Sequence, residues 1–96
     1  MYVSAATIWE AEIKRATRKL RVDADLVRVV DEAGFERLEI TFEHAVEAGR
    51  LPLYHRDPFD RMLVAQARLE GLTLATSDES IARYGIPLLT VTARTA

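Results

Sequence analysis

Apolar residues recur at helical spacing through the first third of the chain. This pattern predicts a helix that starts after Ser4, a good N-cap residue, and runs to about Leu20. A second helix is predicted between an N-cap at Asp23 and a terminating glycine at Gly34. The expected buried stripes comprise Ala6, Trp9, Ile13, Ala16 and Leu20 in the first helix and Leu26, Val29, Val30 and Ala33 in the second.

Four short segments have the pattern of β-strands. Residues 2–4 read as the end of a strand, and residues 37–41 alternate as a half-buried strand does. Residues 72–76 form the third predicted strand. Residues 87–91 form the fourth, which lies at a sheet edge or starts just after Pro87.

Two further helices are predicted from their end signals. Thr41 would cap a helix that ends near Gly49. Asp78 would cap a short helix that ends near Gly85. The helices and strands alternate along the chain, which predicts an α/β fold with a short, mainly parallel sheet flanked by helices, in a single domain over residues 1–96.

The segment that follows the loop at residues 51–56 has two interpretations. Asp57 is a good N-cap, Pro58 suits the first helical position, and Gly71 would stop the helix after Glu70. Asp60 falls three residues after the cap, where a capping-box acid belongs, although Glu or Gln is more usual there. Asp60 is therefore either a capping acid or part of an acidic site.

Composition limits the chemistry that is open to this chain. Fifteen acidic and 13 basic residues give a net charge of −2, so bulk charge does not attract nucleic acid and local basic patches or metal ions would be needed. There is no cysteine, so any metal ligands must be carboxylates or the two histidines. Carboxylate sites suit Mg²⁺ or Mn²⁺. No apolar run is long enough to span a membrane, and a cytoplasmic protein is expected.

Three acids follow predicted strand ends or open a helix: Glu10, Asp60 and Asp78. Ligands gather at the carboxyl ends of strands in parallel sheets, so these carboxylates are expected to converge. Clustered carboxylates repel one another unless a divalent cation neutralises them. Each acid also has a purely structural interpretation, because Glu10 can pair with Lys14 and the two aspartates can cap helices.

Other conspicuous residues have structural interpretations. Trp9 is expected in the core rather than as a platform for base stacking. The histidines, His44 and His55, lack metal-type spacing and are expected at the surface. A basic run is expected to be a solvated face, with a phosphate-tracking patch as the alternative; it comprises Lys14, Arg15, Arg18, Lys19 and Arg21.

Three segments, taken together and in this order, resemble PIN-domain toxins, and most closely the VapC-like toxins of bacterial and archaeal toxin–antitoxin pairs. They are residues 2–10 (YVSAATIWE) with Lys14 after them, residues 57–67 (DPFDRMLVAQA), and residues 71–78 (GLTLATSD). The resemblance covers nearly all of the chain. It implies a parallel sheet flanked by helices and a ribonuclease that depends on Mg²⁺ or Mn²⁺.

The resemblance also implies roles for individual residues. Glu10 corresponds to the second acid of the family's site, Asp60 to the third and Asp78 to the fourth, and all three would be metal ligands and catalytic residues. Asp57 keeps its role as a cap. Thr76 and Ser77 stand where hydroxyl groups could orient an acid or a water molecule.

One departure from the family pattern is expected to matter. PIN-domain toxins open with a central strand that carries the first catalytic Asp, followed by helices, and this sequence begins at the segment after them. An N-terminally truncated PIN-like fold is therefore expected. It would bind metal more weakly, expose strand edges, and favour a homodimer with exchanged elements.

Three functional hypotheses stay open on the sequence. The first is a metal-dependent ribonuclease that cleaves RNA, with reduced activity. The second is a non-catalytic module that binds an antitoxin protein or self-associates. The third is that the sequence is a fragment or a mis-started reading frame of a full-length nuclease, which the codons upstream of Met1 would decide.

Overall fold

The computed structural model describes residues 1–20, 23–76 and 78–90. Internal contacts divide the chain into two compact units, Met1–Ile40 and Thr41–Ala96, which are described one at a time. The described strands form two parallel pairs, one in each unit, rather than one continuous sheet. The predicted α/β class with parallel strands and flanking helices is confirmed, and the assignment to a single domain stays a prediction.

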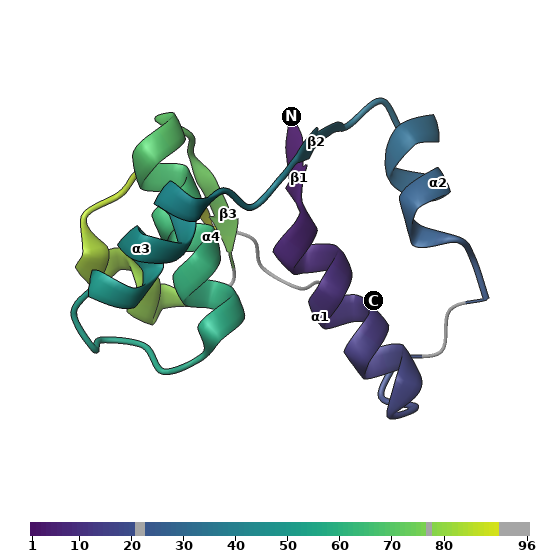
Figure 1. The fold of residues 1–96 in the computed structure, drawn as a ribbon, viewed down its shortest axis with the longest axis horizontal. Coiled ribbons are helices and arrows are strands. Elements are labelled where there is room, and N and C mark those ends of the chain that lie inside the picture. The colour runs from purple at the N-terminus through teal and green to yellow at the C-terminus, as the bar shows by residue number, and fades with distance from the viewer. Residues whose placement is uncertain (21–22, 77, 91–96) are drawn as a thin grey trace. The chain divides into compact units, whose positions relative to one another are not determined.

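The N-terminal unit contains two strands and two helices (Figure 1). In chain order these are β1 (Tyr2–Ser4), α1 (Ala5–Ala16), α2 (Leu26–Glu32) and β2 (Glu36–Leu38). Strand β1 pairs with β2 in parallel, with Tyr2 opposite Glu36. The Ser4 hydroxyl accepts the N–H of Ala6 at 3.0 Å, so Ser4 caps α1 as predicted.

The end of α1 and the start of α2 differ from the predicted ones, whereas the end of α2 agrees with its prediction. Helix α1 stops at Ala16, about a turn earlier than predicted, and Arg18 adopts a left-handed φ of 61° that a continuing helix does not allow. Asp25, not Asp23, caps α2, because its Oδ1 accepts the N–H of Val27 at 3.1 Å. Gly34 follows the end of α2 with a φ of 81°, as predicted for a terminating glycine.

The apolar stripes of α1 and α2 are mostly not buried. Trp9 is 61% exposed and Ile13 is 42% exposed, so the prediction that both lie in a core is wrong. Helix α2 has no buried residue at all. The physical reason is that two strands of three residues each leave too little structure within this unit to cover an apolar helix face.

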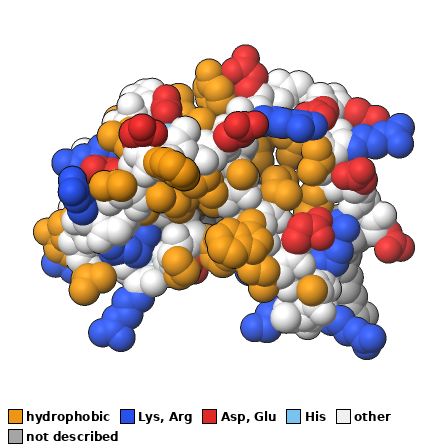
Figure 2. All heavy atoms as spheres, viewed as in Figure 1, with side chains coloured by type: hydrophobic (Ala, Val, Ile, Leu, Met, Phe, Trp, Pro, Cys, Tyr) orange, Lys and Arg blue, Asp and Glu red, His pale blue; other side chains and the backbone are white. Residues whose placement is uncertain are grey.

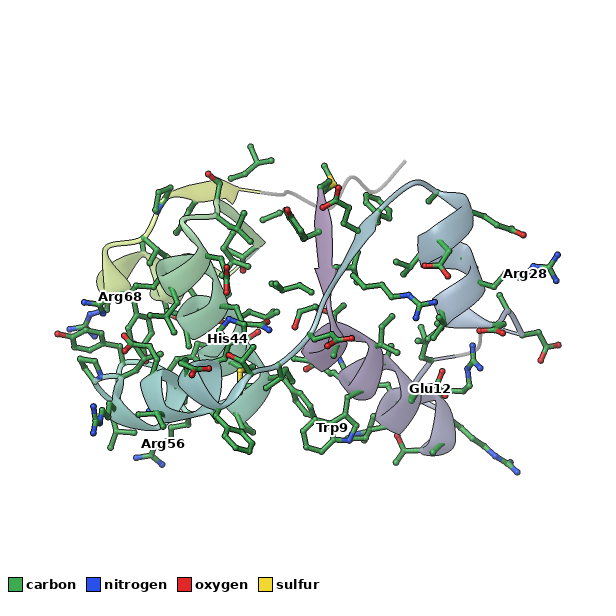
Figure 3. All side chains as sticks on the ribbon, turned by 45° about the horizontal axis from the view of Figure 1, so that its top comes forward. Trp9, Glu12, Arg28, His44, Arg56 and Arg68 are labelled. Atoms are coloured by element: carbon green, nitrogen blue, oxygen red, sulfur yellow. The ribbon has the colours of Figure 1, made fainter. Side chains whose placement is uncertain are left out.

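An apolar groove results from this incomplete covering. It has a volume of about 340 Å³ and is lined within the N-terminal unit by residues of β1, α1, α2 and β2 together with Glu39. Trp9 of α1, labelled in Figure 3, is one of the residues that line this groove. The lining residues are Val3, Ala5, Ile8, Trp9, Val27, Val30, Arg37, Leu38 and Glu39.

An exposed ion pair in this unit is expected to make stability weakly dependent on pH. The hydrogen bond from Arg37, 2.6 Å from its Nη2 to Oδ2, lowers the pKa of Asp31 below its ordinary value of 3.8. The pKa of Asp31 is lower in the folded state than in the unfolded state. The contribution of the ion pair to folding stability is therefore complete at pH values above 3.8 and is lost as the pH falls through the pKa of the folded state. We expect Asp31→Asn to lower the urea midpoint slightly at pH 7 and not at pH 2. A difference in urea midpoint between wild type and Asp31→Asn that is equal at the two pH values would contradict this expectation.

The C-terminal unit contains helices α3 (Phe42–Arg50) and α4 (Pro58–Glu70), the 3₁₀ helix η1 (Glu79–Tyr84), and strands β3 (Leu74–Thr76) and β4 (Leu88–Thr90). Strands β3 and β4 pair in parallel, with Leu74 opposite Leu88 (Figure 1). The bounds of α4 are those predicted, and β4 starts just after Pro87. Val91, the predicted last residue of that strand, lies outside the described residues.

Helices α3 and α4 and the 3₁₀ helix enclose a small core in this unit. Its buried members are Ala48, Leu51, Val64, Ala65, Ile81 and Tyr84, with Met62, Leu74, Ile86 and Leu88 packed against them. This core fixes the start of α4 and the end of β3 relative to each other, and these are the two places where the predicted site residues stand.

His44 lies in this interior and is only 2% exposed, so its predicted surface position is wrong. Its ring completes a capping box at the start of α3: Nδ1 accepts the N–H of Thr41 at 3.0 Å, and Nε2 lies 2.8 Å from Oε1 of Glu70. A histidine can be buried when its two ring nitrogens are both partnered, as they are here. Figure 3 shows His44 pointing from α3 toward α4.

Candidate metal centre

The start of α4 places the first candidate ligand. Asp57 is the N-cap: its Oδ1 accepts the N–H of Phe59 at 2.9 Å and that of Asp60 at 3.4 Å. Pro58 occupies the first turn, where its missing N–H removes no helical hydrogen bond. Asp60 therefore stands in the first turn of α4, with a side chain that is 27% exposed.

The end of β3 places the second candidate ligand. Asp78 follows this strand by two residues, and its N–H donates to Oγ1 of Thr76 at 3.0 Å. Thr76 thus orients the backbone at the acid, which is consistent with the orienting role predicted for its hydroxyl. The other predicted hydroxyl, that of Ser77, lies outside the described residues.

Asp78 is ionised at neutral pH. Its Oδ1 accepts the Ser80 hydroxyl at 2.6 Å and the Ser80 N–H at 2.9 Å, and its Oδ2 lies 2.7 Å from Nε2 of His55. The hydrogen bond from the Ser80 hydroxyl, followed by the one from His55, lowers the pKa of Asp78 from 3.8 to about 2. The carboxylate is therefore available as a ligand at neutral pH.

Three side chains converge at this point: His55, Asp60 and Asp78. Each offers a ligand atom, and these atoms all lie within 4.8 Å of one another. The His55 Nε2 is 2.7 Å from Oδ2 of Asp78 and 3.3 Å from Oδ2 of Asp60. The structure thus brings together two of the three predicted acids and adds a histidine that the sequence interpretation had placed at the surface. That placement is wrong, because the His55 side chain is only 16% exposed.

Glu10, the third predicted acid, lies on α1 in the N-terminal unit. Its Oε2 is 3.9 Å from Nζ of Lys14, and its side chain is 26% exposed. The helix pair that the structural interpretation expected is therefore present, and such a pair contributes little to stability. Because Glu10 and the cluster belong to different units, its convergence with the two aspartates stays a prediction.

The loop that carries His55, residues 51–57, is held by side chains from two other elements. The Tyr84 hydroxyl accepts the N–H of His55 at 3.0 Å and donates to the carbonyl of Pro52 at 2.7 Å. The guanidinium of Arg61 donates to the carbonyls of Pro52 and His55 at 3.1 and 3.3 Å. Arg56, next to His55, is exposed and extends outward (Figure 3). The backbone at His55 is thus fixed on both its N–H and its C=O sides.

The donor set fits a hard divalent cation. Mg²⁺ takes one or two carboxylates from a protein and completes its octahedron with water and substrate phosphate oxygens. Asp60 in the first turn of α4 and Asp78 at the cap of η1 supply two carboxylates, and both side chains are exposed enough to admit water and a phosphate group. With two negative charges within reach of one point, a divalent cation would neutralise their repulsion.

Comparison with known proteins gives one match. No curated protein and no solved structure matches this chain. The model of one family, described as the PIN domain, matches residues 1–87. These residues include the whole N-terminal unit, the C-terminal unit up to Pro87, the candidate metal centre and the predicted ligand Glu10. The short parallel strands with flanking helices and the paired carboxylates are in agreement with that match, and the chain belongs to the PIN domain family.

Proposed function

We propose that this chain is a metal-dependent ribonuclease of the PIN-domain toxin type, which hydrolyses phosphodiester bonds in RNA with Mg²⁺ or Mn²⁺. The observation that carries the proposal is the convergence of Asp60 and Asp78 beside His55, with ligand atoms within 4.8 Å, in a chain of a nuclease-like family. Glu10 is proposed as a further ligand. The VapC-like subgroup, an antitoxin partner and a homodimer belong to the same proposal.

The residues of the centre have separate tasks in this proposal. Asp60 and Asp78 hold the cation, and Asp78 stays ionised because Ser80 and His55 donate to it. The cation, when bound, would supply Lewis-acid activation of the phosphodiester and of the attacking water. The Asp57 cap and the hydrogen bonds to the loop keep the carboxylates at a fixed separation, which limits the reorganisation needed during the reaction.

Local cations must attract the RNA, because the net charge of the chain is −2. Acidic and basic side chains are interspersed on the face shown in Figure 2, so that face offers no broad positive surface. Near the centre, exposed Arg56 follows His55 in the loop, and the Arg83 guanidinium lies 4.7 Å from the centre of the Tyr54 ring. These groups are suited to contact phosphates and a base.

Cleavage of RNA is expected to require an added divalent cation. The test follows a fluorescent RNA pool with the purified chain in Mg²⁺, in Mn²⁺, in Ca²⁺ and in excess chelator. We expect cleavage in Mg²⁺ or Mn²⁺, and its loss in chelator followed by full recovery when the cation is restored. Cleavage that persists in chelator, or none with any cation, would contradict the proposal.

A second candidate function is favoured by the N-terminal unit: a non-catalytic module that binds an antitoxin segment or a second copy of the chain. The observations are the apolar groove and helix α2, which has no buried residue. A surface of this kind commonly marks a protein contact.

Trp9 provides a direct test of this second candidate, because it is the only tryptophan of the chain and lines the groove. We expect its fluorescence to shift to shorter wavelength when the protein encoded beside it is added, or with rising concentration of the chain alone. Emission that stays unchanged under both conditions would count against the module.

A further inference from the structure

His55 stands between the two carboxylates of the centre and has two possible roles. Its Nε2 is 2.7 Å from Asp78 and 3.3 Å from Asp60, close enough to bind the same cation as a third ligand. The alternative is that Nε2 carries a proton and donates it to the carboxylates. The two roles exclude each other, because a ring nitrogen binds a metal through the lone pair that a proton would occupy.

The hydrogen bond at Nδ1, the other ring nitrogen of His55, decides between these two roles. The backbone N–H of Asp57 points at Nδ1 of His55 at a distance of 3.0 Å, so Nδ1 is an acceptor and carries no proton. In a neutral imidazole the proton is then on Nε2. That proton faces both carboxylates, and Nε2 has no lone pair left for a cation.

The alternative tautomer is opposed by the surrounding backbone. A proton on Nδ1 would face the N–H of Asp57, whose position is set by its role as the N-cap of α4. Tyr84 and Arg61 hold the backbone of His55, and the ring is held at Nδ1 by the N–H of Asp57 and at Nε2 by Asp78, so turning the ring would break both of its contacts. The backbone at the Asp57 cap therefore fixes the tautomer of the His55 ring.

We propose that His55 is a positioning residue rather than a metal ligand: its Nε2–H holds Asp60 and Asp78 together at the separation that a divalent cation requires. The inference rests on the proposed function of the same centre. Without the cation, the shared proton donor offsets the repulsion between the two carboxylates. With the cation, donation can continue, because each carboxylate oxygen has two lone pairs and can accept a hydrogen bond while it binds a metal.

The position of the proton can be read by ¹⁵N NMR of the imidazole rings, with and without Mg²⁺. The chain has only two histidines, and His44 also accepts a backbone N–H at Nδ1, so it serves as an internal reference away from the cluster. We expect a protonated Nε2 at His55 in both states, with a small change on Mg²⁺ addition and none at His44. Loss of the Nε2 proton from His55 when Mg²⁺ binds would overturn the inference.

Variants test the positioning effect on metal affinity, measured by calorimetry and by Mn²⁺ electron paramagnetic resonance. His55→Ala removes the donor and is expected to weaken binding by about 10- to 100-fold. His55→Gln keeps an N–H donor at a similar distance from the backbone and should recover part of the loss. An affinity in His55→Ala equal to that of the wild type would overturn the inference.

Different results would overturn the proposed function and the positioning role of His55. A wild-type chain that binds neither Mg²⁺ nor Mn²⁺ would overturn the proposed function and the positioning role with it. A chain that binds the cation, but through a deprotonated His55 nitrogen, would leave the proposed function intact and overturn the positioning role alone.

Discussion

Asp60→Asn is expected to lower the rate of metal-dependent RNA cleavage by about a hundredfold or more. The substitution keeps the size of the side chain and replaces a charged ligand by a neutral one. Charge stabilisation by a catalytic cation amounts to several kcal/mol, and about 1.4 kcal/mol corresponds to a tenfold change in rate. The same loss is expected for Asp78→Asn, because both carboxylates reach the same point.

The measurement is single-turnover cleavage in Mn²⁺ over a range of cation concentrations, together with cation affinity. Asp57→Asn is the matched control: it removes a charge three residues before Asp60 but keeps a good N-cap, since Asn and Asp cap helices equally well. We expect its rate to stay within a few-fold of the wild type. Activity of Asp60→Asn equal to that of the control would remove the metal-dependent mechanism.

Where local chemistry decides the structure, the sequence was sufficient to predict it. The caps of α3, α4 and η1 at Thr41, Asp57 and Asp78, and the left-handed glycines Gly71 and Gly85, stand as predicted. Each cap depends on a side chain and a backbone N–H within three residues of it, and each glycine depends on its own backbone conformation. Distant contacts therefore have little influence on these positions.

Burial could not be predicted in the same way. The helical spacing of Trp9 and Ile13 correctly identified an apolar face of α1, but spacing does not say what covers that face. Within the N-terminal unit the strands are only three residues long, and the face stays largely exposed. The opposite error occurred at His44, a polar residue that is buried because both its ring nitrogens have partners.

Only part of the site could be predicted, because local patterns mark some of its residues and not others. Asp60 and Asp78 could be selected because each follows a recognisable helix start or strand end. The role of His55 depends on Asp78, 23 residues further along the chain, and no local pattern marks that contact. The only local sign was its place two residues before the N-cap Asp57, where a ring can accept the N–H of the cap residue.

Arg61 was missed for a similar reason, and we expect it to make the largest single contribution to the stability of the C-terminal unit among its arginines. Its guanidinium donates to four carbonyls: Ala48 at 2.8 Å, Leu51 at 3.0 Å, Pro52 at 3.1 Å and His55 at 3.3 Å. Ala48 and Leu51 lie at the end of α3, where carbonyls lack helical partners. The positive charge is also favourable at that end of the helix dipole.

Arg61→Met keeps the aliphatic stem but leaves these carbonyls without their donor. We expect the free energy of unfolding in urea to fall by about 2–4 kcal/mol, given about 1.5–3 kcal/mol for a hydrogen bond to a charged group and incomplete additivity among four. Arg61→Lys should recover only part, because an ammonium group lacks the planar fork of donors.

Arg68→Met is the control on the same helix. Arg68 is 53% exposed and lies 3.5 Å from Glu47, a surface pair whose loss should cost less than about 1 kcal/mol. Equal losses in the two methionine variants would contradict the role assigned to Arg61. The loop held by Arg61 carries His55, so cation affinity should fall in Arg61→Met and be unchanged in Arg68→Met. Cation affinity distinguishes the two arginines, because only Arg61 holds the backbone of His55, the residue proposed to position the two carboxylates.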